Sequence, residues 1–147
     1  MPYPEEMCAP MRAELTQIGF EELRAADDVA QFMDGATGSA MILFNSVCGC
    51  AAGNARPAVA LAIGNEQKPD RVATVFAGQD VEATEKVRSY FPDVPPSSPS
   101  IVLMKDGQIT HYVPRHMIEG RDPQTIANAL VGAFAELAGT GEAAAEK

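Results

Sequence analysis

The chain has 147 residues, of which 46% are hydrophobic and 21% charged, and this length and composition suit one α/β domain with a single core. Its formal net charge of -9, from 11 basic and 20 acidic residues, opposes binding to a polyanion and excludes nucleic acid as an expected partner. No apolar run approaches the roughly 20 residues that a membrane helix needs, and residues 1–6 lack the basic start and apolar middle of a signal peptide. We therefore expect a cytoplasmic protein that associates with no membrane.

The chain up to residue 45 predicts two helices and two strands. In order, these are a helix over 5–18, a short strand over 20–23, a helix over about 27–34 that Gly35 ends, and a strand over 40–45. Acidic residues in the first turn and Gly19 after the last turn favour the first helix. Residues 40–45 are almost all apolar, which is typical of a strand buried on both faces.

The rest of the chain continues this alternation. We expect a helix over 51–63, a strand over 71–77, a helix over 81–90, strands over 100–105 and 108–113, and a helix from the Asp122–Pro123 cap to about Leu137. Asp106–Gly107 is a strong hairpin signal, and the prolines between residues 92 and 99 prevent regular structure there. Residues 1–138 thus form one predicted domain, and the Ala, Glu and Gly segment 139–147 is expected to be a disordered tail.

Pro57 lies inside the predicted helix over 51–63 and has two interpretations. Proline lacks a backbone N–H, and its ring clashes with the preceding turn. It therefore either kinks this helix or marks the residue at which the regular helix begins. The sequence leaves both alternatives open.

The order of elements predicts a central mixed sheet flanked by helices. A strand, a helix and a second strand over residues 40–77 form a right-handed crossover with parallel strands. Two cysteines stand between the carboxyl end of the first of these strands and the helix. Reaction sites of open α/β sheets lie at this edge.

The chain has three cysteines, Cys8, Cys48 and Cys50, which is too few for a disulfide-stapled secreted domain and indicates reduced thiols. Cys48 precedes the predicted helix, where unpaired backbone N–H groups and the helix dipole favour a thiolate. Cys50 lies within the first turn, and we expect it to be less exposed. These positions predict that Cys48 attacks a disulfide and that Cys50 resolves the product.

Gly49 separates the two cysteines, and its missing Cβ permits the unusual torsions of a disulfide between residues two apart. The small ring should be strained and easily reduced. Two alternatives compete with this redox function. Both cysteines are inert, buried small residues, or they bind a soft metal together with Cys8, His111 or His116, although none of these has diagnostic spacing. Cys8 itself fits a buried apolar position better than a third redox partner.

Four further residues are candidates for binding what the cysteines capture. Ser98 and Pro99 precede a predicted strand, and a cis bond between them would leave the backbone amide groups of Ser98 free for a bound peptide or thiol. Asn54 and Arg56 lie one turn past the cysteines, within reach of the carboxylate of an adduct, or they are simply exposed helix residues. Arg115–His116 after the last strand would attract an acidic substrate, but a solvated loop is the interpretation that the sequence favours.

Several blocks of the sequence resemble one protein family. The run from Asn45 to Pro57, with Cys48-Gly49-Cys50 inside it, is similar to the active-site signature of the bacilliredoxins. Other agreeing segments are Tyr3 to Met7 with Pro10 to Arg12, Val75 to Asp80, Pro95 to Ser100, and Pro114 to His116 with Glu119 to Arg121. The similarity covers nearly everything except residues 139–147, and these blocks in order are far more specific than a bare Cys-x-Cys.

The resemblance implies a thioredoxin-like fold with Pro99 as a cis-proline facing the cysteine pair. It also implies a thiol–disulfide oxidoreductase that removes bacillithiol, a low-molecular-weight thiol, from proteins that carry it as a mixed disulfide. Cys48 matches the attacking cysteine of the family and Cys50 the second one. Bacillithiol or a related thiol is then a co-substrate, bacillithiolated proteins are the partners, and no tightly bound cofactor or metal is expected.

The sequence departs from ordinary thioredoxins at Ile42, where they carry a buried aspartate six residues before the attacking cysteine. Proton transfer would then rely on water, the backbone or the partner thiol. Cys8 stands where we would expect an aliphatic residue in this family. A general protein disulfide isomerase and a Cys-x-Cys metal-binding module are the alternative functions, and the sequence carries no signal for a particular oligomeric state.

Overall fold

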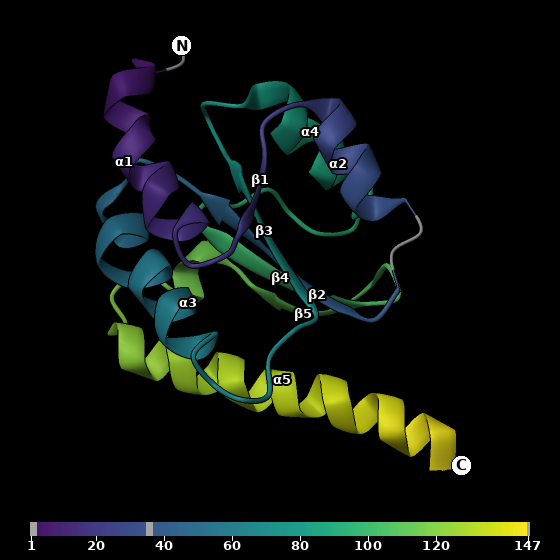
Figure 1. Cartoon of the computed structure of the whole chain (residues 1–147). Helices are drawn as coiled ribbons and strands as arrows, with labels where there is room; N and C mark the ends of the chain where they lie inside the picture. Colours follow the sequence, from purple (N-terminus) through teal and green to yellow (C-terminus); the bar gives the residue numbers. More distant parts are fainter. Residues whose placement is uncertain (1–2, 35–36, 147) are drawn as a thin grey trace.

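The structure, a computed structural model, describes residues 3–34 and 37–146, so Gly35, the predicted stop of the second helix, lies outside the described residues. Within these ranges the strands form one sheet in the order β1–β3–β2–β4–β5 (Figure 1). They are β1 (Glu21–Leu23), β2 (Ser39–Asn45), β3 (Arg71–Phe76), β4 (Ser100–Lys105) and β5 (Gln108–Val113). β1 and β2 both run parallel to β3, whereas β4 is antiparallel to β2 and β5. The predicted α/β architecture with a mixed sheet of thioredoxin-like type is confirmed.

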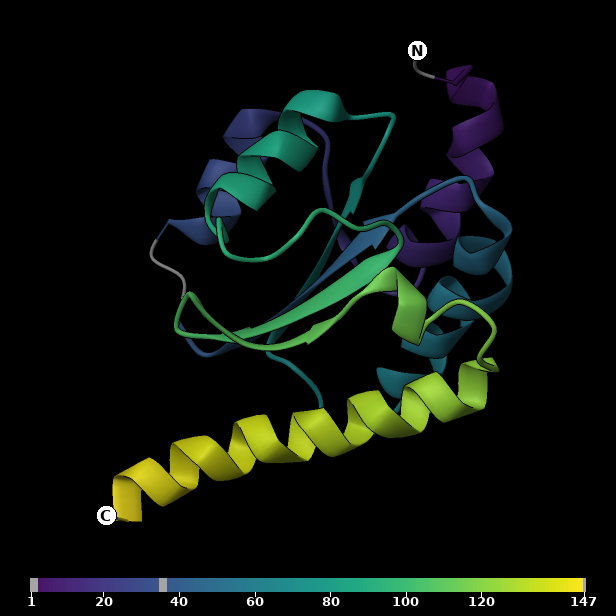
Figure 2. The same ribbon diagram turned by 180° about the vertical axis from the view of Figure 1, so that it is seen from behind.

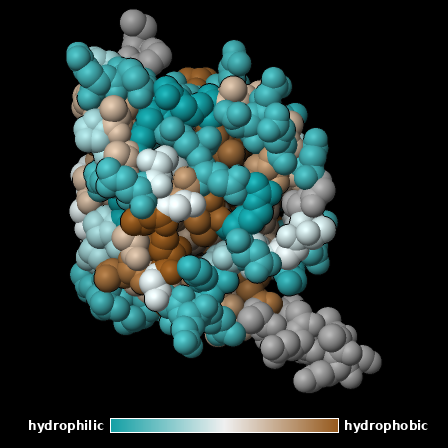
Figure 3. All heavy atoms as spheres, in the orientation of Figure 1, coloured by the Kyte–Doolittle hydropathy of each residue, from teal (hydrophilic) through white to brown (hydrophobic). Residues whose placement is uncertain are grey.

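Helices cover both faces of this sheet. They are α1 (Glu5–Thr16), α2 (Ala26–Met33), α3 (Arg56–Ala62), α4 (Val81–Ser89) and α5 (Pro123–Glu146). Figures 1 and 2 show α1, α3 and α5 on one face and α2 with α4 on the other. Figure 3 shows that hydrophilic residues cover most of the surface in this view, with an apolar patch near α3.

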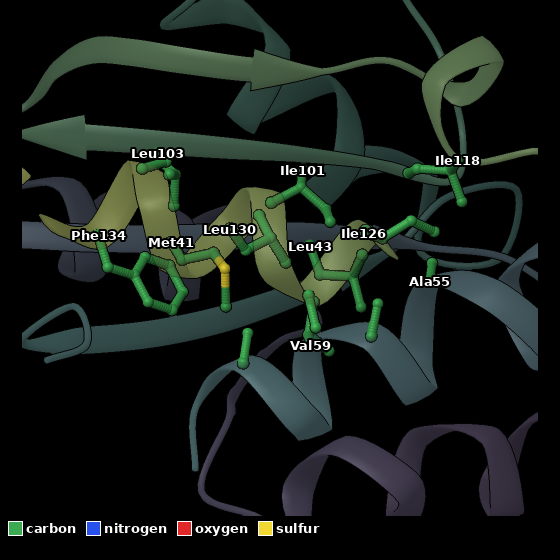
Figure 4. Close-up of a cluster of buried hydrophobic side chains, with 14 of the residues drawn as sticks. Met41, Leu43, Ala55, Val59, Ile101, Leu103, Ile118, Ile126, Leu130 and Phe134 are labelled. Atoms are coloured by element: carbon green, nitrogen blue, oxygen red, sulfur yellow. The ribbon is translucent and has the colours of Figure 1, made fainter. Parts of the chain in front are cut away.

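The alternation of side chains along β2 builds one core on each face. Met41 and Leu43 belong to the cluster beneath α3 and α5, part of which is drawn in Figure 4. Ile42 and Phe44 point the other way, into the cluster beneath α2 and α4. β2 is therefore buried on both faces, as its continuous apolar sequence predicts.

The helix after β2 decides between the two interpretations of Pro57. The chain is helical from Gly49, but the segment η1 (Ala51–Ala55) is a π-helical turn, and the regular α-helix begins only at Arg56. The backbone N–H of Arg56 donates to the carbonyl of Ala51, five residues earlier. A wider turn before Pro57 accommodates a residue that has no N–H to donate. Regular helix thus begins beside the proline, with a π-turn in front of it.

α5 is longer than expected. It runs to Glu146, whereas the sequence predicted its end near Leu137 and irregular structure beyond. The run Glu142 to Glu146 consists of alanine and glutamate, which are strong helix formers and continue the helix despite two preceding glycines. The last turns of α5 project past the sheet in Figure 2. None of the helices in the described ranges has both the length and the apolar character that crossing a membrane demands.

The packing of α5 on the sheet should dominate the stability of this face. Leu130 is 1% exposed inside the cluster shared with α3, so Leu130→Ala should lower the free energy of unfolding by about 2–5 kcal/mol. Leu61 of α3 is 50% exposed, and Leu61→Ala should change the same quantity by no more than about 0.5 kcal/mol. Urea unfolding followed by circular dichroism measures both. Equal losses in the two variants would contradict this packing.

Candidate active site

The cysteine pair lies where β2 ends and β4 begins. Phe44 of β2 pairs with Ser100 of β4 in the antiparallel register. Continuing this register places Ser98 and Pro99 beside the segment that leads from β2 to Cys48. The Ser98–Pro99 peptide bond is cis, as the family resemblance implies.

The two sulfur atoms are held next to each other. Cys48 Sγ and Cys50 Sγ are neighbouring free thiols within hydrogen-bonding reach, and the hydroxyl of Ser46 donates to Cys48 Sγ over 3.2 Å. The carbonyl of Cys48 accepts the backbone N–H groups of Ala51 and Ala52, so Cys48 begins the helix as predicted. Both cysteines are half-buried, and the lower exposure that we expected for Cys50 stays a prediction.

This arrangement shifts the two thiols in opposite directions. Burial would raise the pKa of Cys48, but hydrogen bonds from Cys50, Ser46 and backbone N–H groups outweigh it and hold the pKa below its ordinary value. The pKa of Cys50 is raised, first by burial and then by its hydrogen bond to Cys48 and the negative charge there. Cys48 is therefore the thiol that ionises, and Cys50 keeps its proton and donates it in a hydrogen bond.

Gly49 is exposed between the cysteines. A Cβ added to it would meet no atom within 4 Å, and its φ is not among the positive values. In the dithiol state neither space nor torsion therefore requires glycine. The predicted role of Gly49 concerns the disulfide form alone and stays a prediction.

Arg56 corrects one expectation. The sequence left two alternatives, a side chain that reaches the carboxylate of an adduct or an exposed helix residue, but Arg56 is only 2% exposed. Its Nη1 donates to Asn45 Oδ1 over 2.8 Å and to the carbonyl of Ser46 over 3.0 Å, and its Nε pairs with Glu14 Oε1 at 3.1 Å. The prediction that Arg56 binds the carboxylate of an adduct is wrong, because the acceptors at the end of β2 occupy its guanidinium. Arg56 instead holds the backbone that leads to Cys48.

Asn54 and Arg115 connect the cysteine helix to the turn after β5. The side-chain amide of Asn54 donates to the carbonyl of Arg121. Arg115 begins the short helix η2 (Arg115–Met117), and its backbone N–H donates to Ser97 Oγ over 2.8 Å. Its charge partly offsets the rise that burial causes in the pKa of Cys50. The turn is solvated, as the sequence favoured, yet Arg115 contacts Ser97 and Ser98 in the segment before β4, a long-range arrangement with no local signal. The hydrogen bond from Ser46 to Cys48 Sγ was also not predicted from the sequence.

Cys8 occupies the buried apolar position that was expected for it. It is 0% exposed, and burial is the main reason that its pKa is raised. Within the described ranges no three His, Cys, Asp or Glu side chains gather as a metal site requires. The metal-binding alternative thus receives no support from these residues.

A sheet of thioredoxin-like type with two adjacent thiols at the end of a central strand, one with a lowered and one with a raised pKa, defines a thiol–disulfide oxidoreductase. Comparison with known proteins agrees. A sequence model of the family described as disulphide isomerase matches residues 3–138. The bacilliredoxin of Salinibacter ruber is 54% identical over 148 residues, which covers 99% of this chain and 87% of that protein.

Two other relatives give the same result. The bacilliredoxin of Shouchella clausii is 48% identical over 91% of this chain and 92% of its own length. That of Symbiobacterium thermophilum is 54% identical over 84% of this chain and 87% of its own length. The chain belongs to the bacilliredoxin family.

The opposite pKa shifts predict selective alkylation. A lowered pKa means that the Cys48 thiolate persists as the pH falls and is lost only when the pH drops through the folded pKa. The rate of Cys48 alkylation by iodoacetamide should therefore have its midpoint below about 8.5, the value of free cysteine. Cys50 should have its midpoint above that value. Rates at each cysteine, measured by peptide mass spectrometry across pH, test this.

Ser46→Ala should move the Cys48 midpoint upward because one hydrogen bond to the sulfur is lost. A Cys48 midpoint at or above that of free cysteine would refute the assignment.

The buried position of Arg56 gives a second prediction. Arg56→Met leaves the carbonyl of Ser46 without this donor and should lower the free energy of unfolding by about 1–3 kcal/mol. It should also slow Cys48 alkylation, because the backbone before the sulfur loses its support. Glu14→Gln is the matched control, since it removes only the 49%-exposed partner and keeps both bonds to β2 and its extension. A stable Arg56→Met variant with unchanged alkylation would contradict this supporting role of Arg56.

Proposed function

We propose that this protein removes bacillithiol, or a small thiol of similar kind, from proteins that carry it as a mixed disulfide. The observation that carries the proposal is the adjacent pair of sulfur atoms with opposite pKa shifts. Such a pair attacks with one sulfur and releases the captured group with the other. The relatives named bacilliredoxins in three organisms support the choice of the small thiol.

The first step is an exchange between Cys48 and the client. The Cys48 thiolate attacks the sulfur of the small thiol, the bond between that sulfur and the client breaks, and a new disulfide joins the small thiol to Cys48. The client sulfur leaves as a thiolate and takes up a proton from solvent. One disulfide is exchanged for another, so no net oxidation or reduction occurs. The half-buried Ser98, beside the segment that leads from β2 to the attacking sulfur, is where we expect the client to lie.

A second thiol then completes the cycle. In one route Cys50 loses its proton to solvent, attacks Cys48 Sγ and expels the small thiol as a thiolate, which leaves a disulfide between the two cysteines. A thiol reductant must then supply two electrons to restore the dithiol. In the other route a further molecule of the small thiol attacks the adduct and leaves as its symmetrical disulfide. Both routes use small thiols as co-substrates, with no resident cofactor, and we place them in the cytoplasm, where such thiols are kept reduced.

A general disulfide isomerase is the second candidate function. The family model that matches residues 3–138 carries this description. Isomerisation uses the same attack by Cys48 but starts from a disulfide between two client cysteines. Rates on a client carrying bacillithiol and on a client with scrambled disulfides, measured side by side, distinguish the two functions, and the faster reaction identifies the activity.

The division of labour between the cysteines gives the central test. Cys48→Ser should abolish removal of the small thiol from a client, because the ionising sulfur is lost. Cys50→Ser should still take the small thiol and accumulate it on Cys48, which intact mass spectrometry detects as an added thiol mass. Cys8→Ser is the control and should retain the activity, since Cys8 is buried. Absence of any adduct on the Cys50→Ser variant would rule out the proposed sequence of steps.

A further inference from the structure

We infer that Arg115 binds a carboxylate at the rim of the cysteine pair and gives the protein a preference for small thiols that carry a negative charge. This inference rests on the proposed function in one respect, namely that the group captured by Cys48 comes from a small thiol. Arg115 takes the place of Arg56 as the residue expected to bind the carboxylate of an adduct, because the guanidinium of Arg56 is buried.

Two contacts place Arg115 against the segment before β4 that runs beside the chain leading to Cys48. Its Nη1 lies 3.4 Å from the carbonyl of Ser98, and its backbone N–H donates to Ser97. The register between β2 and β4 sets Ser98 next to the segment that ends in Cys48. The guanidinium also senses the cysteine pair: after its hydrogen bond to Glu119, negative charge at the pair is the next cause that raises the pKa of Arg115.

The turn that carries Arg115 is anchored on the helix that carries the cysteines. Ile118, three residues further along, is 0% exposed and belongs to the same core cluster as Ala55 of η1, as Figure 4 shows. The bond from Asn54 to the carbonyl of Arg121 ties the end of the turn to the same π-helical segment. The backbone that carries Arg115 therefore keeps its position relative to the cysteine helix without a ligand.

The guanidinium of Arg115 is available to a ligand. Its side chain is 46% exposed, whereas the guanidinium of Arg12 and that of Arg56 are buried in ion pairs. Glu119 Oε2 accepts from Nε over 3.3 Å and from Nη2 over 3.1 Å, on one edge of the guanidinium. Both terminal nitrogens carry a further N–H, which matches the oxygens of an incoming carboxylate. In a chain of net charge -9, a cation at this rim would attract anionic small thiols that the rest of the surface repels.

Two alkylating reagents that differ in charge test the inference. Iodoacetate carries a carboxylate and iodoacetamide does not, so the ratio of their rates at Cys48 cancels any change in the nucleophilicity of the sulfur. At about 0.01 M ionic strength, where the Debye length is about 30 Å, Arg115→Gln should lower this ratio about threefold. Arg115→Glu should lower it further and Arg115→Lys should retain most of it. Lys68→Gln, which removes one exposed charge in the loop before β3 at the opposite end of the sheet, should leave it unchanged.

The same preference should appear with small-thiol substrates. One client protein is loaded with 3-mercaptopropionate, 2-mercaptoethanol or cysteamine, whose free ends are negative, neutral and positive. The unaltered protein should remove 3-mercaptopropionate fastest, and Arg115→Glu should reverse the order between the first and the last. Equal reagent ratios in the unaltered protein and Arg115→Gln, or an unchanged order of substrates, would overturn the inference. The proposed function fails separately, if Cys48 captures none of the three thiols.

Discussion

The hydrogen bond between the two sulfurs is the interaction on which the site depends. Burial, and after it the hydrogen bond to Cys48 and the charge that settles there, keep the proton on Cys50. Ser46 and the first N–H groups of the helix decide the direction, because they surround Cys48 and stabilise its anion. The asymmetry between attacking and resolving thiol is thus a property of the pair and its surroundings, since the two residues are chemically identical.

That asymmetry requires the backbone before Cys48 to be held still. β2 brings the chain to this point through a core that closes on both of its faces. Arg56 then reaches back from the helix to Asn45 and Ser46, so the element after the cysteines supports the element before them. The positive charge of Arg56 is balanced, because its guanidinium forms an ion pair with the exposed carboxylate of Glu14. Arg56 and Arg115 therefore have different roles. Arg56 holds the backbone before the nucleophile Cys48, and Arg115 is exposed to solvent at the rim of the cysteine pair.

Much of this molecule could be predicted from its sequence, and the errors have physical causes. The buried β2, the hairpin at Asp106–Gly107 and the cysteines at a helix start follow from local patterns, and the cis bond before Pro99 follows from family resemblance. The face of Arg56 could not be predicted, because a π-turn adds a residue to the turn and rotates everything after it by about 100° relative to a regular helix. The place of Arg115 depends on how the turn after β5 folds back, which no local pattern records. α5 is longer than expected because the alanines and glutamates after Gly141 favour helix strongly enough to continue it past two glycines.

The burial of Cys8 separates it from the redox chemistry of the other two cysteines. Its sulfur is enclosed in α1 and its pKa is raised by burial, so in the native state it is shielded from oxidants and from disulfides on partner proteins. Unfolding removes that shield. The sulfur of Cys8 therefore reports on unfolding. A thiol titration of the folded dithiol form should count two sulfurs, and a count of three shows that the domain has unfolded.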